Sequence, residues 1–158
     1  MTNRIIILII AFFIVSCNNK KELEESGKIP NANNVFTTID YDKVVAYSYD
    51  GEGDVEIIDK SGNLAEKIKK QSTLNKFQIT KLTNAICDKS TYGGDIAACF
   101  DPHFGIVFYK KNKVVAYVSI CLDCNYLISS VKIPFDGGFS NDGIKKIEDF
   151  EKELNFFK

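Results

Sequence analysis

The chain has 158 residues and a formal net charge of −1, with 20 lysines and arginines against 21 aspartates and glutamates. This balance, with no basic run after Lys20 and Lys21, excludes nucleic acid from the partners we expect. Arg4 is the one arginine in the sequence. The rest of the chain therefore lacks the guanidinium groups that bind phosphate through two hydrogen bonds, which argues against phosphotransfer chemistry.

The first residues have the pattern of a secretory signal peptide. Arg4 precedes an almost unbroken apolar run, Ile5 to Val15, and then come Ser16, Cys17 and a polar stretch. A basic start, a short apolar run and a small residue before the junction are typical of such a leader, and a membrane-spanning helix needs roughly 20 apolar residues. We expect residues 1–16 to be removed. An ordinary signal peptide cut beside an incidental cysteine, or an uncleaved anchor, are the alternatives.

The residues before the junction resemble the lipobox of bacterial lipoproteins, since Ile14 to Cys17 ends in a small residue and a cysteine. The resemblance implies that Cys17 is the first residue of the mature chain and carries a diacylglyceryl group, with palmitate as a typical acyl chain. Two acyl chains are enough for stable anchoring, whereas one is not. Asn18 in place of aspartate implies, within the same resemblance, sorting to the outer membrane. We therefore expect a protein of the cell envelope, held in the membrane through Cys17.

The remainder divides into a tether and one domain. Residues 17–34 are rich in asparagine, lysine and glutamate and lack apolar periodicity, so we expect a flexible lipidated tether. Residues 35–158 are enough for one hydrophobic core but not for two, which predicts a single globular domain.

The first half of this domain begins with β-rich runs. Val44 to Tyr49 and Val55 to Asp59 are predicted strands joined by a turn at residues 50–53. The next run, Leu64 to Gln71, fits either a helical turn or a third strand of a meander.

Two helices follow from start signals and apolar stripes. Asn75 and Gln78 have the spacing of a capping box, which predicts a helix from Lys76 to Cys87. A second helix, roughly Asn141 to Phe156, is predicted by an apolar stripe formed by Ile144, Ile147, Phe150, Leu154 and Phe157.

A hairpin is predicted between the helices, with strands Gly105 to Tyr109 and Val114 to Cys121 around a turn at Lys111 and Asn112. A two-residue turn at that place pairs positions as Phe108 with Val115, Ile106 with Tyr117, Pro102 with Cys121 and Cys99 with Cys124, with His103 beside Ile120. The pairing gathers four reactive side chains at one end of the hairpin: Cys99, His103, Cys121 and Cys124. These elements together predict an α+β fold, with an antiparallel β-sheet of about four to six strands packed against two α-helices.

The same segment resembles a block found in a group of uncharacterised bacterial proteins, many with lipoprotein leaders. The likeness spans about Leu82 to Ser129 and rests on Cys99-Phe100-Asp101-Pro102-His103, on the run to Tyr109, and on Ile120-Cys121-Leu122-Asp123-Cys124. The resemblance implies that the cluster matters and implies no particular activity.

Several kinds of chemistry fit the cluster. Disulfide bonds are the plainest interpretation in an oxidising compartment, and Cys87, Cys99, Cys121 and Cys124 allow three full connectivities. Among these, Cys99 with Cys124 clamps the hairpin, whereas Cys121 with Cys124 leaves Cys87 to reach Cys99. A zinc-type Cys₃His site of Cys99, His103, Cys121 and Cys124 is the second interpretation. A thiol-redox pair, a Cys–His dyad, and a histidine with no chemical role are the others.

These observations favour a membrane-anchored envelope lipoprotein that acts as a non-catalytic binding module, with an unknown protein or small molecule as its ligand. Metal binding or thiol-redox chemistry at the cluster is the alternative, and a small inhibitor or immunity lipoprotein is a further one. We expect no cofactor, apart from zinc in the second case. A separate surface around Tyr47, Tyr49 and the acidic turn Asp50 to Asp54 has the residue types that bind a sugar or a cation.

Overall fold

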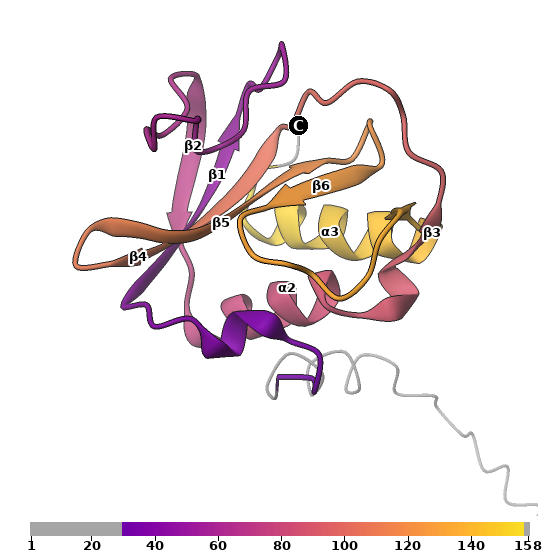
Figure 1. The fold of residues 1–158 in the computed structure, drawn as a ribbon, viewed down its shortest axis with the longest axis horizontal. Helices are drawn as coiled ribbons and strands as arrows, with labels where there is room; N and C mark the ends of the chain where they lie inside the picture. Colours follow the sequence, from indigo (N-terminus) through magenta and orange to yellow (C-terminus); the bar gives the residue numbers. More distant parts are fainter. Residues whose placement is uncertain (1–29, 157–158) are drawn as a thin grey trace, which may run out of the picture.

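A five-stranded antiparallel sheet forms the centre of the protein in a computed structural model that describes residues 30–156 (Figure 1). Its strand order is β2-β1-β4-β5-β6. The strands are β1 (Lys43–Tyr49), β2 (Ile68–Thr73), β4 (Phe104–Lys110), β5 (Lys113–Cys121) and β6 (Tyr126–Ser129). A two-stranded sheet of β3 (Tyr92–Gly94) and β7 (Gly138–Phe139) lies beyond the β6 end.

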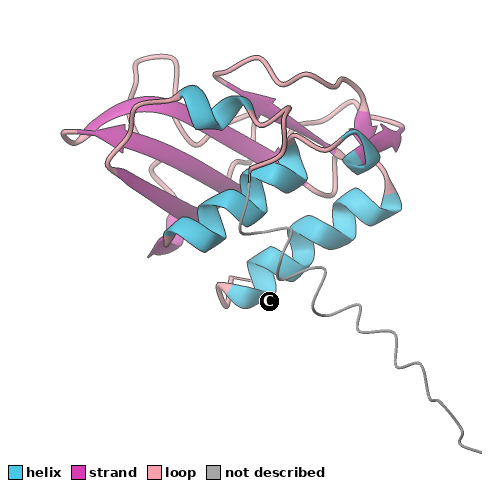
Figure 2. Ribbon diagram, turned by 90° about the horizontal axis from the view of Figure 1, so that it is seen from below, coloured by secondary structure: helices cyan, strands magenta, loops and turns pink. Residues whose placement is uncertain are grey.

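Helices α2 (Lys76–Ile86) and α3 (Asn141–Glu153) both cover one face of the large sheet (Figure 2). The main core lies between them and the sheet, where Phe104, Phe108 and Phe150 are almost completely buried. Short 3₁₀ turns, η1 (Val35–Thr38) and η2 (Lys89–Thr91), flank the helix layer. This arrangement confirms the predicted α+β class, with an antiparallel sheet and two helices.

The opposite face of the sheet has a second core. Strand β1 alternates, so that Val44 and Ala46 face the helices while Tyr47 and Tyr49 face the other side. Residues 50–67 fold over that side and bury their own apolar side chains, including Ile57, against it. The sheet is therefore buried on both faces, with helices on one and a long irregular segment on the other.

This covering segment corrects the predicted strand Val55 to Asp59. A single bridge between Ile58 and Leu64 is its only ladder pairing within residues 50–67. The Ile57 backbone N–H donates to the side-chain hydroxyl of Ser119 on β5 at 2.9 Å instead of to a backbone carbonyl of an adjacent strand. Burial of Ile57 and Ile58 on the sheet face has taken precedence over the local strand pattern. The next strand starts later, at Ile68, and pairs with β1, which resolves the earlier ambiguity in favour of a strand.

The local helix signals are confirmed at their starts. Asn75 accepts the Gln78 N–H at 2.9 Å, and the Gln78 side chain accepts the Asn75 N–H at 3.0 Å, which completes the capping box. Helix α3 ends at Glu153, short of the expected Phe156, because Asn155 adopts a left-handed conformation with φ 57°. The reversal turns Phe156 back against Phe104, with their ring centroids 6.3 Å apart.

The hairpin is confirmed and its register is corrected. Lys111 and Asn112 both have positive φ, 49° and 63°, as a two-residue turn of this kind requires. A bulge between Phe108 and Tyr109 then shifts the pairing by one residue. Phe108 consequently lies opposite Ala116 rather than Val115, and Ile106 lies opposite Val118 rather than Tyr117. The predicted pair of Pro102 with Cys121 is not formed, because the pairing of β4 with β5 ends at Phe104 and Ile120.

The leader, Cys17 and most of the predicted tether lie outside the described residues. The last tether residues lie within them and contact α2. Asn31 N–H donates to the Asn84 side chain at 2.9 Å, and the buried Asn34 side chain donates to Thr83 at 2.8 Å. The contacts with the domain thus begin before residue 35. Within residues 30–156 no helix has both the length and the hydrophobicity to cross a bilayer.

Candidate functional site

The predicted cluster is built around a disulfide. Cys121 ends β5, Cys124 lies in the four-residue turn before β6, and the two are bonded to one another. Both are almost completely buried and pack with Phe100 and Tyr126 in a small core of their own. Because the bond closes a loop of only four residues, chain entropy accounts for about 2 kcal/mol of stabilisation. The disulfide thus crosslinks a single turn and does not join strands that are distant in sequence.

The other two cysteines within residues 30–156, Cys87 and Cys99, are not joined to each other. Cys87 is buried at the C-terminal end of α2, where burial raises the pKa of its thiol. Cys99 is exposed on the loop that connects β3 to β4. Of the pairings that the sequence left open, Cys121 with Cys124 is formed, whereas Cys99 with Cys124 and Cys87 with Cys99 are not. The loop that carries Cys99 still lies against this turn, since the Ala97 N–H donates to the Cys124 carbonyl at 3.0 Å.

His103 lies beside Ile120, as the predicted hairpin placed it, although the residue paired with Ile120 is Phe104. The backbone N–H of His103 donates to the Ile120 carbonyl at 3.2 Å, just beyond the last paired residues of β4 and β5. The ring is half exposed, and its Nε2 atom is 3.9 Å from an Asp123 carboxylate oxygen. Over residues 30–156 no three histidine, cysteine or acidic side chains are grouped as metal ligands. With Cys121 and Cys124 bonded, the zinc site stays a prediction for a reduced form.

The predicted aromatic and acidic surface around residues 47–54 lacks its aromatic part, while Glu52 and Asp54 in the turn are exposed. Tyr47 and Tyr49 are buried in the second core, and the Tyr47 hydroxyl lies 2.9 Å from the Tyr109 hydroxyl. A carboxylate oxygen of Asp50 lies 4.0 Å from the side-chain nitrogen of Lys67 and 4.0 Å from that of Lys69. These tyrosines are structural residues and are not exposed for a sugar or a cation.

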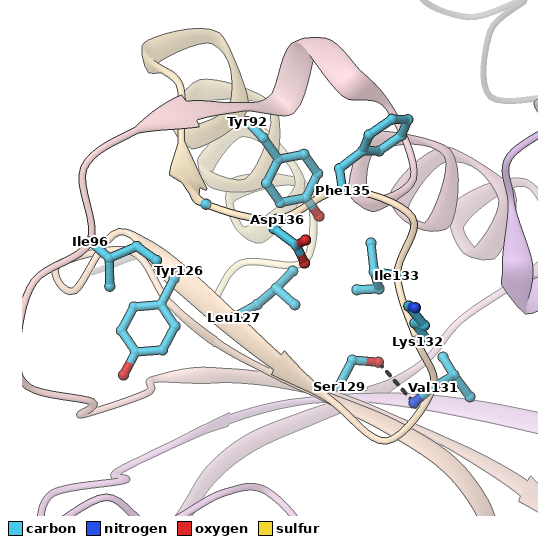
Figure 3. Close-up of a pocket in the computed structure, with 11 residues that line it drawn as sticks. Tyr92, Ile96, Tyr126, Leu127, Ser129, Val131, Lys132, Ile133, Phe135 and Asp136 are labelled. Carbon is cyan, nitrogen blue, oxygen red and sulfur yellow. Dashed lines mark hydrogen bonds between the residues drawn. The ribbon is translucent and has the colours of Figure 1, made fainter.

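A pocket of about 290 Å³ lies beside β6, and the sequence analysis did not identify it (Figure 3). Seven of its eleven lining residues have apolar or aromatic side chains, while Ser129, Lys132, Asp136 and backbone groups make its surface mixed in polarity. The apolar lining side chains are Tyr92, Ile96, Tyr126, Leu127, Val131, Ile133 and Phe135. Apolar walls with a few polar groups are the usual composition of ligand pockets, although this one is at the small end of their size range.

Strand β6, the segment that follows it and the more distant residues Tyr92 and Ile96 build this pocket. Residues 131–137 leave the end of β6 and return toward β7, so the pocket lies between the strand and this returning segment (Figures 1 and 3). The return begins at a contact in which the Val131 N–H donates to the Ser129 hydroxyl at 3.2 Å. At the other end, the Phe139 N–H donates to the Asn125 carbonyl at 2.9 Å. Tyr92 closes one wall, with its hydroxyl fixed on the Ile86 carbonyl at 2.6 Å.

Strand β6 is the last strand of the five-stranded sheet, and its outer edge faces the pocket. The Ser130 N–H donates to the Tyr117 carbonyl on β5 at 3.0 Å. Backbone groups alternate in direction along a strand, so Ile128 also faces β5, while the backbone groups of Leu127 and Ser129 face outward. Both of these residues line the pocket. The site therefore combines a small pocket with a strand edge to which no other strand within residues 30–156 is paired.

Sequence reasoning missed this site because the segment that closes it is short and contains a proline. The run Val131 to Phe135 alternates, with Val131, Ile133 and Phe135 as its apolar residues, but Pro134 argues against a strand there. The available sign was three apolar residues in a short connection, where polar residues are the rule.

Comparison of the whole chain with protein-family models, with curated proteins and with solved structures finds no match. The resemblance to a group of bacterial lipoproteins accordingly stays a prediction.

Proposed function

We propose that the protein is a lipid-anchored binding module of the cell envelope, and that its site is the pocket beside β6. The ligand that fits this site is an extended peptide segment with an apolar or aromatic side chain. The observation that carries the proposal is the joint presence of the pocket and the outward backbone of Leu127 and Ser129.

The strand edge supports the backbone part of this recognition. An unpaired edge offers N–H and C=O groups to another strand, and β-strand addition is a general mode of peptide binding. Natural edges are commonly protected by lysines on the strand. The other edge of this sheet follows that rule, since β2 contains Lys69 and Lys70, whereas the β6 sequence is Tyr-Leu-Ile-Ser. The β6 edge is therefore the one suited to pairing.

The pocket supports the side-chain part. In an added strand, alternate side chains point to the same side, so one of them enters a pocket placed beside the edge. The lining offers aromatic contacts from Tyr92 and Phe135, whose ring centroids are 6.1 Å apart. Ile96, on the opposite side of the pocket from Phe135 in Figure 3, is 53% exposed, which leaves apolar area for a ligand to cover.

The anchor is supported by the leader alone. A lipidated Cys17 and a tether ahead of Asn31 hold the domain near a bilayer, where it meets extended segments of other envelope proteins. Replacement of Cys17 by serine is expected to release the protein from the membrane fraction, and a Cys17→Ser chain that stays in the membrane contradicts this part of the proposal.

Binding is tested with the peptide acetyl-Thr-Val-Phe-Val-Thr-amide and its counterpart with glycine at the centre. The full chain, labelled with ¹⁵N and held in detergent, is titrated while amide signals are followed. We expect saturable shifts at residues around the pocket, and binding of the phenylalanine peptide stronger by about tenfold, since burial of a phenyl group contributes about 1.5 to 3 kcal/mol.

Ile96→Asp is the test variant and Val55→Asp its matched control. Both are exposed apolar residues outside strands and helices, 53% and 38% exposed, and only Ile96 lines the pocket. We expect Ile96→Asp to weaken binding at least fivefold, about 1 kcal/mol, and Val55→Asp to leave it unchanged. Equal affinity of both peptides, or equal effects of both variants, would overturn the proposal.

A further inference from the structure

The cysteine cluster has one feature that peptide binding does not use. Cys99 carries a free exposed thiol, while the Cys121–Cys124 disulfide is buried. A buried disulfide is shielded from thiols in solution, because exchange requires a thiolate to reach a sulfur atom. Of these three cysteines, Cys99 is the one that solvent reaches.

The loop that carries Cys99 lies directly on the disulfide. Ala97 N–H donates to the Cys124 carbonyl at 3.0 Å, and Asp101 N–H lies 3.2 Å from the Cys124 sulfur. Cys99 is the midpoint between these two contacts, and Figure 1 shows the loop passing over the turn between β5 and β6. Consecutive Cα atoms are about 3.8 Å apart, so the Cα of Cys99 is within roughly 8 Å of either contact. Residues 95–103 contain no helix or strand, so no ladder hydrogen bond has to break when the loop moves to bring the two sulfurs together.

We propose that Cys99, Cys121 and Cys124 form an internal thiol–disulfide exchange site. The Cys99 thiolate attacks the sulfur of Cys124, the Cys99–Cys124 bond forms, and the Cys121–Cys124 bond breaks. Cys121 leaves as a thiolate and takes up the proton that Cys99 has lost. The reaction conserves the number of disulfides and thiols, and it needs no oxidant or reductant.

A backbone donor is in place for Cys121 as the leaving group. Cys124 N–H lies 3.1 Å from the Cys121 sulfur and is placed to donate to a thiolate there. A hydrogen bond to the charged form of a group favours that form. The loop contacts both sulfurs, since Asp101 N–H lies 3.2 Å from the Cys124 sulfur and the Asp101 carbonyl oxygen lies 3.3 Å from the Cys121 sulfur.

Exchange also changes which thiol is exposed. Before exchange the free thiol is the exposed Cys99, and after exchange it is the buried Cys121. The new bond closes a loop of residues 99–124 in place of a four-residue loop, and longer loops restrict the unfolded chain more. Exchange thus replaces the bond across one turn with a bond that includes Cys99, and the exposed thiol of Cys99 is consumed. Cys99 is the residue with which thiols in solution react first.

The exchange is measured on the oxidised full chain in detergent, incubated at about pH 8, where an ordinary thiol is partly ionised. The sample is quenched with acid, its free thiols are alkylated, and it is cleaved after lysine. Cleavage places Cys87 in peptide 82–89, Cys99 in peptide 90–110, and Cys121 with Cys124 in peptide 114–132. We expect linked peptides 90–110 and 114–132 with Cys121 alkylated. Detection of the bond within peptide 114–132 alone contradicts the proposal.

The rate at which glutathione opens the disulfide gives a second readout. We expect Cys99→Ser to slow it at least about tenfold, because the exposed route is removed. Cys87→Ser is the matched control, since Cys87 is a free thiol with no contact to the bond among the described residues, and we expect no change. Circular dichroism verifies that both variants fold. Equal rates in wild type and Cys99→Ser overturn the proposal.

Discussion

Glu151 on α3 makes the stability of the domain depend on pH. Burial is the first cause that raises the pKa of its carboxyl, followed by the negative charges of Glu148 and Asp123. Lys152 acts in the opposite direction and does not compensate for them. The pKa rises from 4.5 to about 7, so Glu151 binds a proton in the folded state under conditions where the unfolded chain has lost it.

The sign and the size of the effect follow from this difference. Between pH 4.5 and about 7 the folded state binds more protons than the unfolded state, so the free energy of unfolding falls as pH rises through that window. The stabilisation is complete below the unfolded pKa and is lost above the folded one. Each unit of pKa shift corresponds to about 1.4 kcal/mol, which gives a loss of roughly 2 to 3 kcal/mol for a partly buried group.

Urea unfolding of wild type and Glu151→Gln at about pH 5 and about pH 8 measures this loss. We expect wild type to lose roughly 2 to 3 kcal/mol more than the variant between the two conditions. Glu66→Gln is the matched control, because Glu66 is exposed on the segment that covers the opposite face of the sheet. The reasoning is refuted if Glu151→Gln has the same pH dependence as wild type.

Three further changes test the fold. Asn75→Ala removes the capping box with Gln78 and is expected to cost about 1 kcal/mol, a fall of roughly 3 to 5 °C in Tm by calorimetry; an unchanged Tm contradicts the role of the cap. Phe150→Ala opens a cavity in the main core and is expected to cost about 3 to 5 kcal/mol in urea unfolding; a cost below about 1 kcal/mol contradicts that placement. Gly105→Ala places a methyl group 2.7 Å from the Ile57 side chain and is expected to cost about 1 to 3 kcal/mol. Ile57→Ala in the same chain is expected to recover part of that cost, and no recovery argues against the contact.

The elements that sequence reasoning predicted are those with local causes. The capping box at Asn75 needs only a partner three residues away, and the turn at Lys111 and Asn112 needs only two residues that tolerate positive φ. The bulge after Phe108 has no such local signal, so the register derived from the turn was wrong by one residue. The local sequence around Ile57 predicts a strand, and the burial of Ile57 on the sheet face could not be predicted from that local sequence.

The candidate site was predictable in the same limited sense. The hairpin brought the cysteines and His103 to one end, and the structure confirms that His103 and the loop around Cys99 lie beside this end. The bond between Cys121 and Cys124 was one of several pairings that spacing allowed, and only the turn geometry distinguishes them. The pocket depends on Tyr92, on β6 and on the returning segment together, a combination that no window of sequence contains.

The most direct test of peptide binding at β6 is amide hydrogen exchange at three neighbouring residues, Leu127, Ile128 and Ser129. In the free protein the account predicts slow exchange at Ile128, which faces β5, and fast exchange at the other two. With acetyl-Thr-Val-Phe-Val-Thr-amide bound, it predicts that exchange at Leu127 and Ser129 slows at least about tenfold while Ile128 is little changed. Unchanged exchange at Leu127 and Ser129 with the peptide at saturation would contradict strand addition at this edge.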